Sequence, residues 1–284
     1  MNTNVQKTIK GKGDTIMSKN ISAAQAGTIS IGDFTVNRIG LGTNRITNTP
    51  DAHNLLKRAL ELGTNFIDTA HLYGDGESEK GIASALAPYG NGLLVATKGG
   101  ANGNDPQQLR GELEDSLKRL KVDRIDLYQL HRVDANIPLE ATMQLLKSFQ
   151  DEGLIKHIGL SEVTVEQLQL AMQIAPIVSV QNEYNVFNRK YEALVDFCTE
   201  HQIVFIPWFP LGGLFGDTAK VEERVASIAR KLDVTTQQVA LKWLLQRSPI
   251  ILPIPGTLSP IHLEDNLRAA TLELSEEDYA ALTN

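Results

Sequence analysis

An acid and a phenol lie five residues apart directly after an apolar run of this sequence. Asp68 ends the run, and Tyr73 lies in the short polar stretch that comes next. Two later apolar runs also end in groups that can do chemistry, Lys98 and His131. Each residue alone has an ordinary explanation as a helix cap, a surface phenol, a solvated lysine or a hydrogen-bonded histidine. Their coincidence at the ends of three successive predicted strands favours a shared site.

The reaction that these four side chains suit is proton donation to a carbonyl oxygen while the carbonyl carbon accepts a hydride. A free phenol has a pKa of about 10, so it needs a nearby cation that stabilises the phenolate before it can act as an acid at neutral pH. Lys98 can supply that charge, and Asp68 can keep the lysine protonated. His131 can orient the carbonyl by donating a hydrogen bond. As the general acid, Tyr73 is expected to contribute about 10²- to 10⁴-fold in rate.

The chain around these residues alternates eight times between a short aliphatic run and a segment of helical period. This pattern predicts a (β/α)8 barrel rather than an open doubly wound sheet, with the active site at the carboxyl ends of the strands. Before the first strand, residues 28–37 predict a β-hairpin that turns at Gly32-Asp33 and plugs the bottom of the barrel. The predicted strands are 38–42, 65–68, 93–98, 125–130, 155–160, 177–181, 203–208 and 250–254.

Helix starts are indicated by capping residues and prolines. Such starts occur at Asp51, Asp105-Pro106, Pro138 and Thr164. Two more helices, 221–232 and 236–247, are predicted in the seventh connection, and a last one follows Ser275. We expect these three helices to be decorations outside the barrel.

Length and composition limit the classes of protein. A chain of 284 residues with 42% hydrophobic residues fits one barrel domain, which we place at residues 27–284 after a flexible, polar extension of residues 1–26. A net charge of −7 excludes nucleic acid and anionic membranes as favoured partners. The one cysteine, Cys198, reads as a packed thiol, and no apolar stretch indicates a signal or a membrane span. We therefore expect a cytoplasmic protein.

At this point the sequence resembles the aldo-keto reductases over nearly everything from Thr28 to the end. The family's catalytic tetrad matches Asp68, Tyr73, Lys98 and His131, and no metal is implied. The matching motifs are Gly40-Leu41-Gly42-Thr43, Phe66-Ile67-Asp68-Thr69-Ala70-x-x-Tyr73-Gly74, Lys98, His131, Ile158-Gly159-Leu160-Ser161, Gln181-Asn182-Glu183-Tyr184-Asn185, Pro210-Leu211-Gly212 and Ile254-Pro255-Gly256-Thr257.

The resemblance implies NADPH as cofactor, bound across the barrel mouth without a Rossmann fold, and Gly40-x-Gly42 indeed lacks a third glycine. Ser161 and Gln181 would hold the carboxamide, and Trp208 would stack on the nicotinamide ring. Without the resemblance, Gln181 is equally an interior amide and Trp208 a core residue. Other implied contacts are Gly42 and Thr43 near the nicotinamide, Pro210, Leu211 and Gly212 near the pyrophosphate, and Gly256, Thr257, His262 and Asn266 at the adenosine end.

Some positions depart from the family pattern. Glu162 stands where many members have Asn, and a carboxylate cannot donate a hydrogen bond to the carboxamide oxygen. The basic residues that meet the 2′-phosphate in the most NADPH-specific members are replaced by Gly256 and His262, although hydroxyl and backbone donors at a helix start remain. We favour NADPH over NADH. Residues 213–218 read as a brief clasp over the pyrophosphate or an ordinary loop.

Two residues indicate a polar substrate. Asn44 replaces the aromatic residue of members with apolar pockets, and Arg132 follows His131, either to bind an anionic substituent or as a surface arginine. The expected substrate is a small polar or heteroaromatic aldehyde, with pyridoxal as a candidate, reduced by a monomeric enzyme. Two alternatives stay open. One is a Schiff-base lyase or aldolase using Lys98, and the other is a non-catalytic nucleotide-binding sensor or regulatory subunit.

Overall fold

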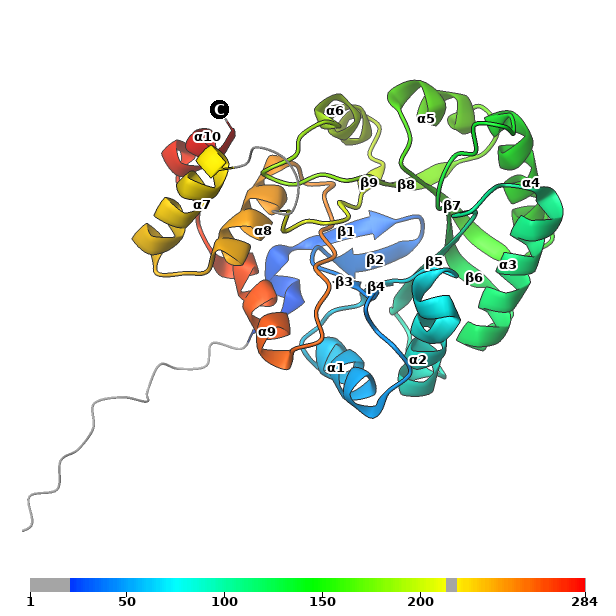
Figure 1. Cartoon of the computed structure of the whole chain (residues 1–284), viewed down its shortest axis with the longest axis horizontal. Helices are drawn as coiled ribbons and strands as arrows, with labels where there is room; N and C mark the ends of the chain where they lie inside the picture. Colours follow the sequence, from blue (N-terminus) through cyan, green and yellow to red (C-terminus); the bar gives the residue numbers. More distant parts are fainter. Residues whose placement is uncertain (1–20, 213–218, 284) are drawn as a thin grey trace, which may run out of the picture.

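The computed structural model describes residues 21–212 and 219–283 of the chain. Within these residues, one parallel sheet runs in strand order β3-β4-β5-β6-β7-β8-β9 and curls into a barrel with helices outside it (Figure 1). The fold predicted from the sequence, a (β/α)8 barrel, is confirmed. The strands are β3 (Leu41–Gly42), β4 (Phe66–Asp68), β5 (Leu94–Gly99), β6 (Ile125–Leu130), β7 (Ile155–Ser161), β8 (Ile177–Gln181) and β9 (Val204–Phe205).

The eighth predicted strand, 250–254, closes the barrel without forming a regular strand in the described chain. Isolated parallel bridges join Ile251 to Phe205 and Gly256 to Gly42, and the Gly40 amide donates to the Pro253 carbonyl over 3.0 Å. Prolines 253 and 255 have no N–H to give to a ladder, which explains the irregular pairing. The first predicted strand is also shorter than expected, since only Leu41 and Gly42 pair with β4.

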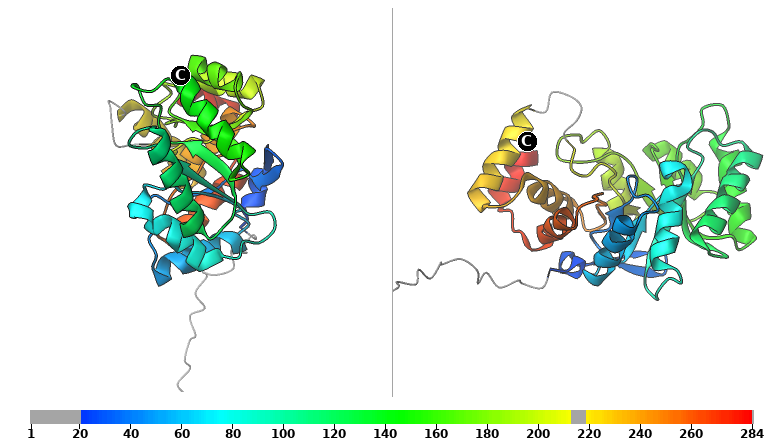
Figure 2. Two further views of the ribbon diagram at one scale, coloured as in Figure 1. Left: turned by 90° about the vertical axis from the view of Figure 1, so that its right-hand side faces the viewer. Right: turned by 60° about the horizontal axis from the view of Figure 1, so that its bottom comes forward.

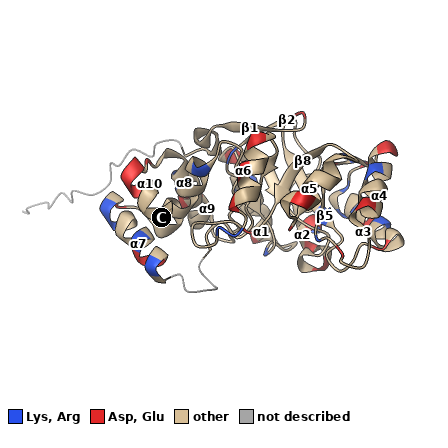
Figure 3. Ribbon diagram, turned by 90° about the horizontal axis from the view of Figure 1, so that it is seen from above, with Lys and Arg blue, Asp and Glu red and all other residues tan. Residues whose placement is uncertain are grey.

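The helices form the outer layer and carry mixed charges on their solvent faces, as seen along α7 in Figure 3. None of the helices within residues 21–212 and 219–283 combines the length and apolar character needed to cross a bilayer. Figures 1 and 2 show them around the barrel. They are α1 (Pro50–Glu61), α2 (Glu77–Leu86), α3 (Pro106–Leu120), α4 (Leu139–Asp151), α5 (Val165–Met172), α6 (Glu192–Glu200), α7 (Ala219–Leu232), α8 (Thr236–Arg247), α9 (Pro260–Arg268) and α10 (Glu276–Thr283).

The predicted helix starts are confirmed except at α1. Asp105 caps α3, and Thr164 caps α5 with a capping box. The cap of α1 is Thr49, whose side chain accepts from the Ala52 amide, and Asp51 lies inside the first turn. A hydroxyl immediately before a proline at the first helical position satisfies a free N–H better than a residue already in the helix.

The prediction that α8 is a decoration is wrong. Its side chains Val239, Trp243 and Leu244 are fully buried and belong to the same core cluster as Phe205 of the barrel wall. This helix therefore covers the barrel. Helices α7 and α10 lie side by side beyond it in Figure 1, so they are the outer additions. Lys231 of α7 forms an ion pair with Asp278 of α10. Cys198 in α6 is buried, as predicted, and burial raises the pKa of its thiol to about 12.

The hairpin of β1 (Thr28–Ile31) and β2 (Phe34–Asn37) closes the amino-terminal end of the barrel, as predicted. Its turn contacts the first residues of β7, because the Asp33 carboxylate pairs with Lys156 and His157, which lowers its pKa. Gly32 has a φ of 57°, and a Cβ there would lie 2.3 Å from the His157 ring. On the other face, Ile31 joins the apolar cluster that fills the barrel interior.

The expected flexible extension ends earlier than residue 26. Ser22 and Gln25 form a capping box around the short helix η1 (Ala23–Ala26). Ala23 is fully buried, and its amide donates to the Leu62 carbonyl over 2.8 Å. The prediction is therefore wrong for residues 21–26, which pack against the end of α1. Residues 1–20 lie outside the described residues.

Shortening a buried side chain of the hairpin should lower the stability of the whole fold. Ile31→Ala removes a fully buried side chain from the cluster inside the barrel, and we expect it to lower the free energy of unfolding by about 2–5 kcal/mol. Thr35→Ala, on the exposed side of the same hairpin, should change it by no more than about 0.5 kcal/mol. Urea denaturation measures both. Equal losses would show that the hairpin does not seal the barrel.

Candidate active site

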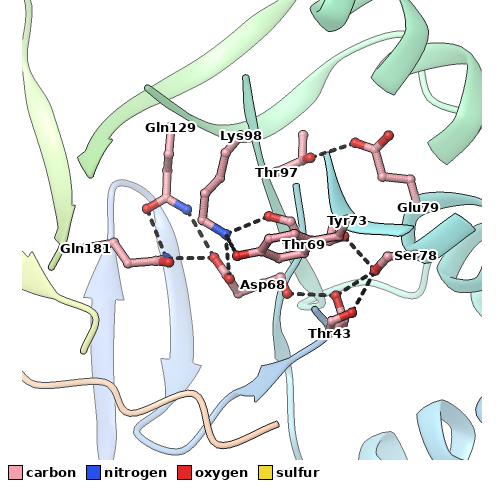
Figure 4. A network of polar contacts seen from close by, with 10 residues as sticks. All are labelled: Thr43, Asp68, Thr69, Tyr73, Ser78, Glu79, Thr97, Lys98, Gln129 and Gln181. Carbon is pink, nitrogen blue, oxygen red and sulfur yellow. Dashed lines mark hydrogen bonds and ion pairs between the residues drawn. The ribbon is translucent and has the colours of Figure 1, made fainter. Parts of the chain in front are cut away.

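A buried ion pair joins two neighbouring strands at the carboxyl end of the barrel. The Nζ of Lys98 in β5 donates to Oδ2 of Asp68 in β4 over 2.6 Å, and both side chains are almost completely removed from solvent. The same ammonium donates to the Thr69 carbonyl over 2.8 Å and to the Tyr73 hydroxyl over 3.2 Å (Figure 4). All three of its protons therefore have acceptors, and one of these acceptors is the phenol.

The surroundings of the pair keep it charged. Burial by itself would lower the pKa of Lys98, but the adjacent Asp68 carboxylate and the Tyr73 oxygen outweigh burial and hold that pKa above its usual value. The second carboxylate oxygen, Oδ1 of Asp68, accepts from Gln181 over 2.7 Å and from Gln129 over 3.2 Å. Donors from three strands, β5, β6 and β8, thus satisfy the Asp68 carboxylate in a charge pair that is almost completely removed from solvent.

Tyr73 and His131 stand between this pair and the open mouth of the barrel. Tyr73 begins the short helix η2 (Tyr73–Gly76), and its ring meets the His131 ring edge to face at a centroid distance of 5.9 Å. Burial, followed by the charges of Lys98 and Arg132, lowers the pKa of His131 from 6.5 to about 3. The imidazole is therefore neutral at physiological pH. It can donate one hydrogen bond toward the mouth, and its Nδ1 has no partner among the described residues.

A cavity of about 520 Å³ opens above these side chains. A second cavity of about 550 Å³ adjoins it, and Arg45, Leu211 and Gly256 line both. Most of the sequence-predicted residues lie in these walls. The first cavity is lined by Asp68, Tyr73, His131, Gly42, Thr43, Asn44, Arg132, Ser161, Gln181, Trp208, Pro210, Leu211 and Gly256, and the second by Thr257, His262 and Asn266.

Two glycines that were predicted to contact the cofactor also have a structural role. Gly212 has a φ of 56° and packs against Phe187 and Asn185, where a Cβ would lie 2.3 Å from the Phe187 ring. Gly42 lines the cavity, but a Cβ there would also lie 2.6 Å from the Ile254 carbonyl, so barrel closure itself demands glycine. The predicted clasp at residues 213–218 lies outside the described residues.

Three contributors to the site were missed in the sequence. Gln129 lies on β6, and His131 directly follows the last residue of that strand. The two-residue period of a strand therefore places both side chains on the same face, which points into the barrel. Ser78 of α2 forms hydrogen bonds with the hydroxyls of Thr43 and Thr69 over 2.9 and 2.8 Å and so joins the segments that follow β3 and β4. Arg45 follows Asn44, and its guanidinium donates to the Gly256 carbonyl over 2.9 Å where the two cavities meet. No sequence signal identified Ser78.

Breaking the ion pair should destabilise the protein strongly. Lys98→Met leaves the Asp68 carboxylate buried without its counter-ion, so we expect the free energy of unfolding to fall by about 3–5 kcal/mol. The double variant Lys98→Met/Asp68→Asn removes both charges and should recover most of that loss. Denaturant titration measures all three proteins. A single variant as stable as the wild type would show that the pair does not carry a buried charge.

His131 should make stability depend on pH. Above its unfolded pKa of 6.5 the ring is neutral in both states, and below it the unfolded chain binds a proton that the folded site excludes down to about pH 3. The free energy of unfolding should therefore fall by roughly 1 kcal/mol per pH unit below 6.5, slightly less than full linkage because the ring is partly exposed. His131→Gln should remove this dependence. Denaturation near pH 7.5 and pH 5 compares the slopes, and parallel slopes would refute the neutral buried ring.

The sequence and the fold can now be compared with those of known proteins. A sequence profile described as the Aldo/keto reductase family matches residues 38–284. An uncharacterized oxidoreductase of Schizosaccharomyces pombe is 44% identical, over 94% of this chain and 92% of its own. The pyridoxine 4-dehydrogenase of Escherichia coli is 39% identical, over 90% of this chain and 96% of its own.

A solved structure shares the same fold. The aldo-keto reductase of Klebsiella pneumoniae, determined in complex with NADPH, superimposes with a TM-score of 0.80 at 26% identity, over 90% of this chain and 93% of its own. The profile match, the two relatives and the strand-end cluster of Asp68, Tyr73, Lys98 and His131 agree with one another. This chain therefore belongs to the aldo/keto reductase family and is an oxidoreductase.

Proposed function

We propose that this protein uses NADPH to reduce the carbonyl group of a small polar or heteroaromatic aldehyde to an alcohol. The observation that carries the proposal is the position of the Lys98 ammonium, which bonds Asp68 on one side and the Tyr73 hydroxyl on the other beneath an open cavity. Such a chain of contacts prepares a phenol to release its proton.

Each of the four side chains has one role in this reaction. Tyr73 gives its proton to the carbonyl oxygen, and the Lys98 ammonium at 3.2 Å stabilises the phenolate that remains. Asp68 holds the ammonium charged and in place. Neutral His131, beside the Tyr73 ring, donates a hydrogen bond to the same oxygen and orients the carbonyl. When bound, NADPH supplies the hydride.

The two joined cavities suit an extended dinucleotide. Trp208 offers a flat face in the first cavity for the nicotinamide ring, with the side chains of Ser161 and Gln181 nearby for its carboxamide. The second cavity ends at the first turn of α9, where the Ser259 hydroxyl caps the helix and accepts from the His262 amide. Helix starts of this kind bind phosphate. The NADPH in the related Klebsiella pneumoniae structure supports this choice over NADH.

Polar side chains line part of the first cavity, beside apolar ones such as Phe209 and Ile254. Asn44 and Arg132 line it together with His131 and the junction residue Arg45, and nothing acidic but the buried Asp68 is found in the described wall. This lining favours an aldehyde that carries hydroxyl, ring nitrogen or anionic groups. Pyridoxal fits that description, and the Escherichia coli relative is named a pyridoxine 4-dehydrogenase. We therefore propose a pyridoxal-like substrate.

The lyase or aldolase alternative conflicts with the state of Lys98. Its ammonium is fully buried and donates three hydrogen bonds, and a raised pKa keeps it protonated, whereas a Schiff-base lysine must be a free amine within reach of the substrate. The sensor alternative leaves the Tyr73 to Lys98 contact without a purpose. A monomeric state and a cytoplasmic location stay predictions from the sequence.

Tyr73→Phe should abolish turnover without abolishing cofactor binding. Removing the hydroxyl removes the proton donor, so we expect kcat to fall by about 10²- to 10⁴-fold, while the NADPH Kd stays within about twofold because the ring remains. NADPH absorbance with a panel of aldehydes that includes pyridoxal, repeated with NADH, measures the first effect, and fluorescence titration measures the second.

Several results would contradict the proposal. A wild-type protein that binds NADPH but turns over no aldehyde in the panel would favour the sensor. Borohydride trapping of substrate on Lys98 would favour the aldolase. Turnover of hydrophobic aldehydes alone, with pyridoxal inert, would refute the polar substrate class while leaving the reduction itself in place.

A further inference from the structure

Glu162 at the end of β7 has a strained backbone at a place where the family pattern has a shorter amide. Its φ is 55°, in the left-handed region that side chains other than glycine, asparagine and aspartate rarely adopt. Its amide donates to the Gln181 carbonyl over 3.1 Å, so the strained residue is held between two strand ends. Backbone strain of this kind persists only where surrounding contacts hold it, and it points to a function for the side chain.

The carboxylate of Glu162 accepts hydrogen bonds from three other residues. Oε1 accepts from the Trp208 indole Nε1 over 2.6 Å and from the Glu183 amide over 2.9 Å, and Oε2 accepts from the Tyr191 hydroxyl over 3.1 Å. A carboxylate has about four lone-pair positions, so three of them are used within the protein. The Glu162 carboxylate therefore has about one lone-pair position left to accept a hydrogen bond from a cofactor carboxamide. Binding that carboxamide is the role that the resemblance gives to the Asn at this position.

The contact to Trp208 fixes the indole on one edge. At 2.6 Å it is a short, charge-assisted bond, stronger than a bond between neutral groups. The Arg132 guanidinium lies 6.0 Å from the centre of the same ring and 3.8 Å from Oε1 of Glu162, so its positive charge is close to both groups. Trp208 and Arg132 both form part of the cavity wall.

We propose that Glu162 is a positioning residue that sets the plane of the Trp208 indole, and that it acts on cofactor binding through this ring rather than as a ligand of the carboxamide. The first half concerns the protein alone. The second half rests on the proposed function, in which the ring is the platform for the nicotinamide. A rigid platform is prepared for its ligand before binding, and a loosened one must be ordered during binding.

The first half is tested by NMR of the cofactor-free protein with ¹⁵N-labelled tryptophan. The chain has two tryptophans, so two indole N–H signals are expected, and Trp208→Phe assigns them. Trp243, which donates to the Thr283 hydroxyl, serves as the internal reference for folding. Glu162→Ala should shift the Trp208 N–H proton upfield and speed its exchange with water by about tenfold or more, while Glu162→Gln, which keeps an acceptor, should restore most of both.

Glu166→Gln is the matched control, because it removes the same charge from the exposed first turn of α5, four residues along the chain. It should leave the Trp208 signal unchanged. A Trp208 signal that is equally unchanged in Glu162→Ala, with Trp243 in its native position, would overturn the proposal.

A double-mutant cycle tests the second half through the Kd for NADPH, measured by cofactor fluorescence. Glu162→Ala should weaken binding by roughly tenfold, and the same change in a Trp208→Phe background should have little further effect, because phenylalanine offers no N–H to hold. Equal weakening in both backgrounds would show a direct ligand and refute the positioning role. If the wild type binds no dinucleotide, the proposed function fails, and the indole signals still decide whether Glu162 orients Trp208.

Discussion

The constraint that shapes this barrel is the burial of one full ion pair, Asp68 with Lys98. Charges removed from water cost several kcal/mol each unless every lone pair and proton has a partner. The barrel supplies these partners from strands far apart in sequence, with Gln129 from β6 and Gln181 from β8 both donating to Oδ1 of Asp68. A single strand pair could not do this, because its side chains reach only their immediate neighbours. Closure of the sheet is therefore as much a requirement of the site as of the fold.

The same pair decides the electrostatics of the cavity above it. The Lys98 ammonium donates one hydrogen bond to Asp68 and one to the Thr69 carbonyl, and its third N–H points to the Tyr73 hydroxyl. Burial, followed by the positive charges of Lys98 and Arg132, disfavours a proton on His131 and lowers its pKa. One buried cation thus contacts the Tyr73 hydroxyl and also helps to keep the neighbouring imidazole neutral.

The sequence was informative where local rules determine geometry. Parallel strands bring their carboxyl ends to one face, so Asp68, Lys98 and His131 could be grouped before any contact was known. Capping chemistry likewise located α3 and α5 from Asp105 and Thr164. What escaped prediction depends on partners distant in the chain. Ser78 looks like any helical serine until Thr43 and Thr69 are seen beside it, and α8 has a weak amphipathic pattern because it is buried on most sides. The prediction of a regular eighth strand was wrong for a reason that is visible in the sequence, namely Pro253 and Pro255.

Glu162 shows why a departure from a family pattern has to be interpreted together with its neighbours. Considered alone, a carboxylate in place of an amide lacks a hydrogen-bond donor, which predicts weaker cofactor binding. Beside Trp208 the change has a clear physical reason, since an indole presents an N–H at its edge and a carboxylate is the strongest acceptor for it. Asp68 and Glu162 then follow one rule at two depths of the barrel mouth. Each carboxylate accepts a hydrogen bond of 2.6 Å from another group of the protein, the buried Lys98 ammonium behind Tyr73 in one case and the Trp208 indole, which lines the cavity, in the other. Both groups are therefore held by the protein itself.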